Sequence, residues 1–348
     1  MTLPPVLVTV AGKTDLGRTR DHNEDTFLVA DLSTGDASLS PARDAHPVGP
    51  RGSLFMVADG MGGAAAGEVA SALASEAIYD HLRTTWSQDH AATPQQFAFR
   101  VREAVEEANR RIHTYAIEHP DVRGMGTTVT VAGVFGHDLY LAQIGDSRAY
   151  LVRRGQATQL TKDQSLTQRL VDAGELTEEE AEKSERRNII LQALGPEPQV
   201  RVDLTYEELR RGDLLILCSD GLSGQVKREE FAEHAVRLTD LDQLCSALID
   251  LANGRGGPDN ITVVAARFEG AGLQEPKATA QEPGYHVFAL PGDTPMEENT
   301  STGYRTGEIK SVARSAPVPV PVRPRPPVGK ITVIIMFVAV LLYFLLRR

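Results

Sequence analysis

The stretch Ser53-Leu-Phe-Met-Val-Ala-Asp-Gly-Met-Gly-Gly63 contains the local signals from which the fold can be worked out. Its first six residues, 53–58, are mostly apolar and β-prone, so they predict a strand. That strand ends at Asp59 and Gly60, and beyond the glycines the apolar residues of 66–82 recur at three- and four-residue spacings, which predicts a helix. A carboxylate at a strand end beside a glycine turn can project into a cleft, so Asp59 is a candidate site residue.

Short strands and helices continue on both sides of this stretch, over residues 1–270. Helices are predicted at 66–82 and 95–117, with shorter ones at 165–173 and 241–252. Runs rich in Val, Ile, Leu and Thr predict strands at 6–10, 26–30, 53–58, 127–135, 139–144, 149–152, 214–218 and 261–267. Because strands outnumber helices and come in runs, the pattern favours an α+β layered sandwich over a doubly wound βαβ fold.

Composition and charge narrow the class of protein. The chain has 348 residues, 41 % of them apolar and 24 % charged, which is typical of a globular protein with a sizeable core. The net charge of −11 is uneven: residues 1–270 hold 27 basic and 41 acidic residues, while 271–348 hold 9 and 6. An acidic globular part argues against nucleic acid as a partner, because binding to phosphate backbone needs a basic surface.

The cysteines exclude several alternatives. Only Cys218 and Cys245 occur, so neither a disulfide framework nor a cysteine-based zinc site is expected, and a reducing compartment is favoured. A cysteine phosphatase needs Arg six residues after its Cys, whereas Gly224 and Leu251 occupy those positions. The N-terminus has neither a basic region nor a long apolar run, so no secretory signal is expected.

The C-terminal region predicts a tethered membrane anchor. Residues 331–346 carry no charge and would form a helix of about 24 Å, which flanking Lys330, Arg347 and Arg348 extend by snorkelling toward a core of about 30 Å. Five basic residues and no acidic one lie in 309–330, so the positive-inside bias predicts a single-pass cell-membrane protein with its globular domain in the cytoplasm. Residues 271–330, with Pro alternating with Val and Arg over 317–327, predict a flexible linker.

Five acidic residues stand at strand ends or in glycine turns. Carboxylates that share a cleft cannot all stay ionised without cations, and hard ions such as Mg²⁺ and Mn²⁺ prefer oxygen ligands. Taken singly, each Asp-Gly pair is more typical of an ordinary turn. Together they predict a metal site formed by Asp25, Asp59, Asp146, Asp220 and Asp259.

Six ordered motifs resemble the metal-dependent protein serine/threonine phosphatases of type 2C. The resemblance runs from about residue 9 to residue 267, and 166–193 resembles the helix-plus-flap insertion of the bacterial branch. It implies a central β-sandwich of two antiparallel sheets flanked by helices, with metals in a channel at one end. The motifs are Arg20-Asp-His-Asn-Glu24-Asp25, Asp59-Gly60-Met-Gly-Gly63, Gly124-Met-Gly-Thr-Thr128, Gly145-Asp-Ser-Arg148, Ser219-Asp-Gly-Leu222 and Asp259-Asn-Ile-Thr262.

The resemblance also implies a role for each matching residue. Asp59 would bridge two Mn²⁺ or Mg²⁺ ions, one of which would also bind the carbonyl of Gly60. Asp220 and Asp259 would complete the other ion's shell, and Glu24 and Asp25 would approach the metals mostly through water. Asp146, with Asp220, matches a third metal site of bacterial members. Arg20 would hold the substrate phosphate, for which its planar fork is suited.

The chemistry expected is hydrolysis of phosphoserine and phosphothreonine in proteins by a metal-activated water, without a phosphoenzyme. Arg20, Asp59 and Asp220 are the residues expected to be catalytic. Two positions depart from the family pattern. Met61 stands where animal members have a histidine proposed as general acid, so water on a third metal near Asp146 is the first alternative and His22 the second. Gln164 stands where related bacterial sequences usually carry histidine, which affects substrate preference more than activity.

A membrane-held phosphatase is expected to oppose a membrane serine/threonine kinase, because tethering raises the effective concentration of both. Two other functions stay open: a small-molecule phosphatase on the same metals, and a tethered phosphoprotein-binding pseudophosphatase. A pseudophosphatase should have lost a metal-binding carboxylate, and none is missing at the matched positions. Substrates, the choice between Mn²⁺ and Mg²⁺, and oligomeric state are not encoded in any recognisable pattern.

Overall fold

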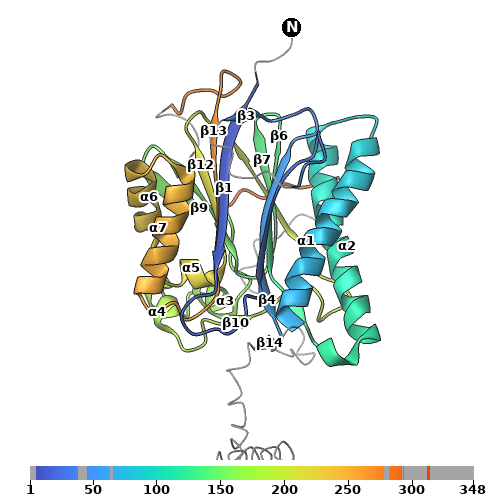
Figure 1. Cartoon of the computed structure of the whole chain (residues 1–348), viewed down its shortest axis with the longest axis vertical. Helices are drawn as coiled ribbons and strands as arrows, with labels where there is room; N and C mark the ends of the chain where they lie inside the picture. The colour runs from blue at the N-terminus through green and yellow to red at the C-terminus, as the bar shows by residue number, and fades with distance from the viewer. Residues whose placement is uncertain are drawn as a thin grey trace, which may run out of the picture. The chain divides into compact units, whose positions relative to one another are not determined.

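The computed structural model describes residues 5–37, 45–62, 66–277, 282–291, 293 and 312–313. Two antiparallel sheets face each other, with helices on both outer sides (Figure 1). The first sheet has the spatial order β3 (His46–Pro47), β1 (Leu7–Asp15), β13 (Ile261–Glu269), β12 (Leu214–Cys218), β8 (Arg148–Arg153), β9 (Gln156–Gln159). The second has the order β11 (Asp203–Glu208), β7 (Asp138–Ile144), β6 (Val129–Phe135), β4 (Ser53–Met61), β2 (Asp25–Asp31), and β5 (Gly126–Thr127) pairs with the end of β4. The predicted α+β sandwich is confirmed.

Strand β4 is buried along its whole length, from Ser53 to Met61. One face packs against the opposite sheet, where Phe55 lies 6.4 Å from Phe268 between ring centroids. The other face packs beneath helix α1 (Ala66–Thr85) together with α2 (Pro94–Glu118). A strand covered on both faces needs apolar side chains at successive positions, which explains the unbroken run 54–58.

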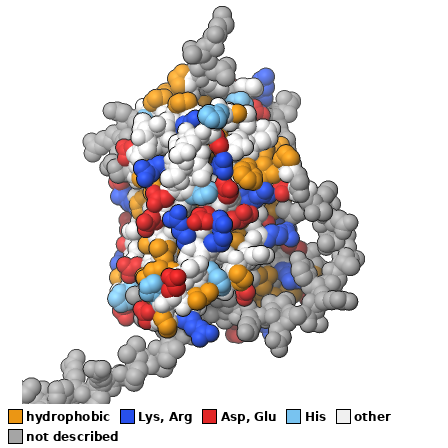
Figure 2. Space-filling view, turned by 90° about the vertical axis from the view of Figure 1, so that its right-hand side faces the viewer, with side chains coloured by type: hydrophobic (Ala, Val, Ile, Leu, Met, Phe, Trp, Pro, Cys, Tyr) orange, Lys and Arg blue, Asp and Glu red, His pale blue; other side chains and the backbone are white. Residues whose placement is uncertain are grey.

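Helices α1 and α2 form the outer layer over the second sheet. Short 3-10 turns follow each of them, at Trp86–Gln88 and Pro120–Val122. Helix α2 begins where Thr93 accepts a hydrogen bond from the amide of Gln96 and Pro94 takes the first helical position. The outer face carries ion pairs such as Arg100–Asp89 at 2.8 Å, and acidic and basic side chains are interspersed across it in Figure 2. This face is therefore a solvated, mixed-charge surface.

The first sheet is covered by α6 (Arg228–Arg237) and α7 (Leu241–Gly254), while the single turn α5 (Asp220–Ser223) follows β12 directly. The two cysteines lie in this layer. Cys218 ends β12 and Cys245 lies on α7, and both thiols are free and buried. Burial raises the pKa of each thiol to about 12, so both stay protonated at neutral pH.

Between β9 and β11 the chain leaves the sandwich as a flap, residues 165–190. The flap contains α3 (Leu166–Asp172), α4 (Glu178–Lys183) and β10 (Ile189–Ile190), and β10 pairs with β14 (Val312–Ala313). Ser165 caps α3 by accepting from the amide of Gln168 at 3.2 Å. Thr177 and Glu180 form a reciprocal capping box on α4. The predicted helix at 165–173 is confirmed.

A segment beyond the sandwich, residues 282–293 with 292 outside the described part, packs along edge strand β11; we call it the strap. Its backbone pairs with β11, since the amide of Tyr206 donates to the carbonyl of His286 and the amide of Phe288 donates to Leu204, both at 2.9 Å. The ring of Phe288 lies 5.2 Å from that of Tyr140, edge to face. This portion of the predicted 271–330 linker is therefore packed against the domain rather than free of it.

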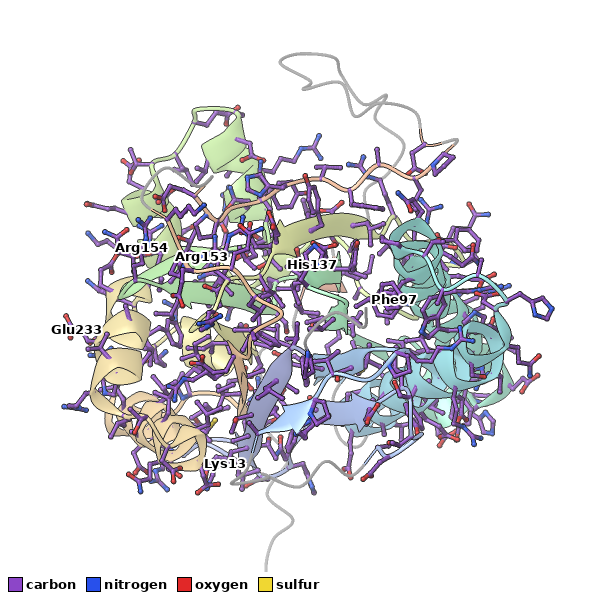
Figure 3. The ribbon with its side chains drawn as sticks, turned by 90° about the horizontal axis from the view of Figure 1, so that it is seen from above. Lys13, Phe97, His137, Arg153, Arg154 and Glu233 are labelled. Carbon is purple, nitrogen blue, oxygen red and sulfur yellow. The ribbon has the colours of Figure 1, made fainter. Side chains whose placement is uncertain are left out.

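Ion pairs hold both ends of the strap. Near its start, Glu282 pairs with Arg154 at 2.6 Å, and Asp293 at its end pairs with Arg102 of α2 at 2.7 Å. Between them His286 lies 3.3 Å from Glu207, which also pairs with the buried Arg153. Figure 3, which looks along the sandwich, labels Arg153 and Arg154 on the side crossed by the strap. The strap thus contacts both the sheet edge and the helix layer.

The sequence misses several short elements. Strands β9 and β11 and helix α6 carry many charged or polar residues and only short apolar patterns, and none of the three was predicted. The predicted strand 127–135 is interrupted at Thr128, so that β5 and β6 are separate. None of the helices in the described part of the chain is long and apolar enough to cross a membrane. The predicted span 331–346 lies outside the described residues.

Candidate metal centre

The predicted acidic residues come from strand ends at one end of the sandwich, where α5 and β10 lie (lower part of Figure 1). Asp25 begins β2 and stands directly opposite Asp59 of β4 in the antiparallel register. Asp220 begins α5 after β12, and Asp259 stands two residues before β13. Because β12 and β13 are neighbours, the topology brings these two residues together.

Asp25 is one of three buried carboxylates of the group, together with Asp59 and Asp146. Its Oδ2 accepts a hydrogen bond from the hydroxyl of Ser219 at 2.8 Å, while Oδ1 is buried with no hydrogen-bond partner. Burial raises the pKa of Asp25 to about 7, and the carboxylates of Asp220 and Asp259 add to the rise, while hydrogen bonds from Thr262 and Ser219 oppose it. The carboxylates of Asp220 and Asp259 therefore act on Asp25 across the facing ends of the two sheets.

Asp220 and Asp259 are held in place by close backbone packing. A Cβ on Gly221 would come within 2.0 Å of the carbonyl oxygen of Asn260 and 3.3 Å of the Asp259 Cβ, so only glycine lets the two turns approach. Asn260 ties the neighbouring loop to them: its Nδ2 donates to the carbonyls of Leu16 and His22, and its Oδ1 accepts from the amide of Glu24. The loop that carries Glu24 is thereby fixed beside Asp259.

Glu24 and Gly60 meet at the start of helix α1. The amide of Gly60 donates to the carbonyl of Glu24 at 3.0 Å. A Cβ on Gly67 would lie 2.8 Å from Oε2 of Glu24, which places that carboxylate against the first turn of α1. Both glycines are needed for this approach, because a Cβ on Gly60 would come within 2.2 Å of the Gly67 carbonyl.

Asp146 lies in the turn between β7 and β8 and is buried. It is connected to the strand of Asp59 by hydroxyls: the amide of Asp59 donates to Thr128 Oγ1 at 3.2 Å, and that atom lies 2.7 Å from Ser147 Oγ. Thr127 adds a hydrogen bond from its hydroxyl to the Asp59 carbonyl at 3.0 Å. The turn that carries Asp146 is therefore joined to β4 through side-chain hydrogen bonds.

Arg20 and Met61 differ in their exposure. Arg20 Nη2 lies 2.9 Å from Asp259 Oδ2, and 37 % of its side chain is exposed, so it can be reached by a solute. Met61 is only 4 % exposed and packs with Ile190 and Ala193 at the base of the flap. His22, the other candidate named for proton transfer, is exposed on the loop beside Asn260.

The donor atoms fit hard divalent cations, which prefer carboxylate and carbonyl oxygens. Asp25 has a buried, unpartnered Oδ1, and its pKa is raised by burial and further by the carboxylates of Asp220 and Asp259. A bound cation would offset this negative charge. Within the described residues, no three His, Cys, Asp or Glu side chains already stand at the spacing of a complete ligand cluster. A metal ion that is also coordinated by the Gly60 carbonyl and by water needs fewer side-chain ligands.

Sequence reasoning missed the polar residues that hold the acids in place. Thr128, Ser147, Ser219, Asn260 and Thr262 all lie inside the motifs quoted above, yet they carried no predicted role. Their position beside each aspartate is the one feature of the sequence that could have indicated this role. The partner of each hydroxyl is nevertheless distant in sequence: Ser219 and Asp25 are 194 residues apart. Without the strand pairing, those hydrogen bonds cannot be assigned.

An α+β sandwich with this acidic group at one end defines a class of metal-dependent serine/threonine protein phosphatases. The family model "Protein phosphatase 2C" matches residues 37–250, more than half of the chain. The chain therefore belongs to the protein phosphatase 2C family and is a protein serine/threonine phosphatase of the bacterial type.

Two bacterial phosphatases show how far the similarity extends. The serine/threonine phosphatase Stp of Listeria monocytogenes is 36 % identical over 253 residues, covering 72 % of this chain and 92 % of Stp. The protein phosphatase PstP of Mycobacterium tuberculosis is 40 % identical over 241 residues, covering 69 % of this chain and 45 % of PstP. The crystal structure of the PstP catalytic domain with two manganese ions superposes with a TM-score of 0.61 at 37 % identity, covering 76 % of this chain and 99 % of that one.

Proposed function

We propose that this chain hydrolyses phosphoserine and phosphothreonine in proteins with two Mn²⁺ or Mg²⁺ ions, and a third at Asp146. The observation that carries the proposal is the convergence of Asp25 of β2, Asp220 of α5 and Asp259 of the turn before β13, where burial and the two other carboxylates raise the pKa of Asp25 to about 7. Such a concentration of negative charge is compatible with neutral pH only when protons or cations offset it. The two manganese ions of the related PstP catalytic domain support the same assignment.

Each site residue has a defined part in this proposal. Asp59 would help to hold both ions, the carbonyl of Gly60 would help to hold one of them, and Asp220 and Asp259 would help to hold the other. Glu24 and Asp25 would bind through water, and Asp146 would hold the third ion. Divalent cations, when bound, supply an activated water and offset the charge of the phosphate oxygens.

Arg20 would bind the phosphate of the substrate. Its guanidinium is held by Asp259 and is more than one third exposed, so it is anchored at the edge of the acidic group yet accessible. A planar fork of N–H donors can contact two phosphate oxygens at once and stabilise the charge that develops on them. Arg20 therefore orients the substrate, while the hydroxyl of Ser219 holds the Asp25 carboxylate and the hydroxyl of Thr128 holds the backbone of Asp59.

The deciding experiment is hydrolysis of a phosphothreonine peptide by residues 1–293, which retain the strap. We expect phosphate release with Mn²⁺ and none with a chelator. The Asp220→Asn variant should release phosphate at least roughly 100-fold more slowly. Loss of a residue that only orients a metal ligand costs about 10–100-fold in activity, and loss of the ligand itself should cost more. Asp80→Asn on the outer face of α1 is the matched control and should retain activity. Folded, metal-loaded protein that releases no phosphate would favour the phosphoprotein-binding module instead.

A second comparison separates protein substrates from small ones. If phosphorylated sugars or nucleotides are hydrolysed faster than phosphothreonine peptides at equal concentration, the small-molecule phosphatase becomes the better assignment. The relatives that are named serine/threonine phosphatases favour the protein substrate.

We further propose that 331–346 anchors the protein in the cell membrane with the catalytic domain in the cytoplasm, where it opposes a membrane serine/threonine kinase. The support is the uncharged run of 16 residues and the basic residues before it. A shared membrane would raise the effective concentration of enzyme and kinase without any new contact.

A further inference from the structure

Gln164 lies where the sandwich ends and the flap begins, and it makes three hydrogen bonds there. Its amide donates to the carbonyl of Gly145, and its side-chain Oε1 accepts from the amide of Gly145, both at 2.9 Å. Its own carbonyl accepts from the amide of Leu191 at 2.8 Å. One residue therefore contacts both the turn that carries Asp146 and the end of the flap.

The turn beside Asp146 depends on Gly145. Gly145 has a φ of +99°, and a Cβ there would come within 2.6 Å of the Thr128 side chain. Its carbonyl also accepts from Nε2 of Gln143 at 3.1 Å. The backbone amide and the carbonyl of Gly145 are both hydrogen-bonded. The residues that bond to them therefore fix the position of the next backbone unit, that of Asp146.

The two ends of the flap meet at the same place. Ser165, the first flap residue, forms an antiparallel bridge with Ile190, the last one. Leu191 follows and donates to Gln164, so the base of the flap closes on this residue. Any movement of the flap about its base would therefore act on Gln164 and, through its two hydrogen bonds, on Gly145.

We propose that Gln164 is a positioning residue that joins the Gly145–Asp146 turn to the base of the flap, so that cation binding at Asp146 and the position of the flap are coupled. This inference rests on the proposed function, because it takes Asp146 as a cation ligand. A purely structural Gln164 would stabilise the loop without linking the two.

The test variant is Gln164→Met, which keeps the length of the side chain and removes the acceptor. Gln164→His is the rescue variant, because a ring nitrogen can accept from the same amide. Gln192→Met is the matched control. The side chain of Gln192 also bonds to a backbone, but to that of Arg201 rather than Gly145: its Oε1 accepts from the Arg201 amide at 2.8 Å, and its Nε2 donates to the Arg201 carbonyl at 3.2 Å.

Calorimetric titration of the whole protein with Mn²⁺ gives the first measurement. We expect Gln164→Met to weaken the weakest Mn²⁺ site by roughly tenfold, as loss of a residue that orients a ligand does, and to leave tighter sites unchanged. Gln164→His should restore the site, and Gln192→Met should match the parent. Equal Mn²⁺ affinities in Gln164→Met and the parent, or equal weakening of all sites, would overturn the proposal.

Trypsin cleavage of the flap gives the second measurement, which needs no activity. Arg186 and Arg187 are exposed on the flap, so their cleavage rate reports its mobility. In the parent, saturating Mn²⁺ should change that rate at least threefold, and in Gln164→Met it should not. If Mn²⁺ leaves the parent's cleavage rate unchanged, the coupling does not exist. If the protein binds Mn²⁺ but releases no phosphate, the proposed function is refuted while the role of Gln164 is not. The Mn²⁺ titration of the variants then still tests Gln164.

Discussion

At the scale of single residues, Asp25 links the site to pH. Its pKa is raised to about 7, so below that pH the cation-free carboxyl carries a proton that a cation must displace. We therefore expect Mn²⁺ affinity to increase as pH rises through 7, with protons released on binding. Calorimetry at pH 6.5 in two buffers of different ionisation enthalpy measures the number released.

Asp25→Asn is the control for that measurement, because it keeps the shape and removes the titrating group. It should lower the proton release by roughly three quarters of a proton per protein, which is the protonated fraction at pH 6.5 of a group with a pKa of about 7. Unchanged release in this variant would show that another group supplies the proton.

Met61 offers a second residue-scale prediction. Its side chain is buried with Ile190 and Ala193, so Met61→His would place an imidazole in an apolar cluster. We expect a loss of roughly 1–3 kcal/mol in the free energy of unfolding, measured by denaturant titration, and no gain in kcat. Met61→Leu, which conserves volume, should cost less than about 1.5 kcal/mol. A new limb near pH 6.5 in the rate profile, with a higher kcat, would instead make position 61 a site for a general acid.

The charged residues of the site could be predicted from the sequence, but the residues that hold them in place could not. Asp59, Asp220 and Asp259 stand beside glycines at strand ends, and that local pattern survives folding. The hydroxyls of Ser219 and Thr128 could not be assigned, because their partners are distant in sequence and fixed only by strand pairing.

At the scale of elements, the strap should stabilise the edge of the second sheet. Leu290 is 4 % exposed, so Leu290→Ala in the full chain should cost about 2 kcal/mol and lower the melting temperature by roughly 4–8 °C. Differential scanning calorimetry measures this shift.

Val287 provides the control in the same segment, since 42 % of it is exposed. Val287→Ala should leave the melting temperature within about 1 °C of the parent, as surface substitutions usually do. If Leu290→Ala behaves in the same way, the strap does not contribute to stability.

The comparison of β4 with β11 shows why some elements were predictable. β4 is covered by the opposite sheet on one face and by α1 and α2 on the other, so its residues 54–58 are all apolar. β11 has the sequence Asp-Leu-Thr-Tyr-Glu-Glu, and its Glu207 is buried only because Arg153 and the strap's His286 pair with it. A strand whose burial depends on a distant ion pair cannot be predicted from its apolar residues alone.

At the scale of the whole molecule, charge and hydropathy are divided along the chain. The acidic part ends near residue 270, and the basic, proline-rich part leads to the uncharged run 331–346. We expect the full chain in cells to remain in the membrane fraction after carbonate extraction, because a spanning helix resists it. Deletion of 331–348 should move the protein to the soluble fraction.

Activity toward the phosphothreonine peptide is the control, because the deletion should leave it unchanged in solution. Recovery of the full chain in the soluble fraction would contradict the anchor. Unchanged dephosphorylation of membrane kinases by the deleted form would contradict the role of tethering.

The two buried thiols also have a practical consequence for fluorescence spectroscopy. With a pKa of about 12, neither Cys218 nor Cys245 presents a thiolate to an alkylating dye at neutral pH. A single cysteine introduced at exposed Glu185 on the flap would then take up a maleimide dye against a silent background. The native sequence is thus already suited to site-specific labelling, with no cysteine to remove first.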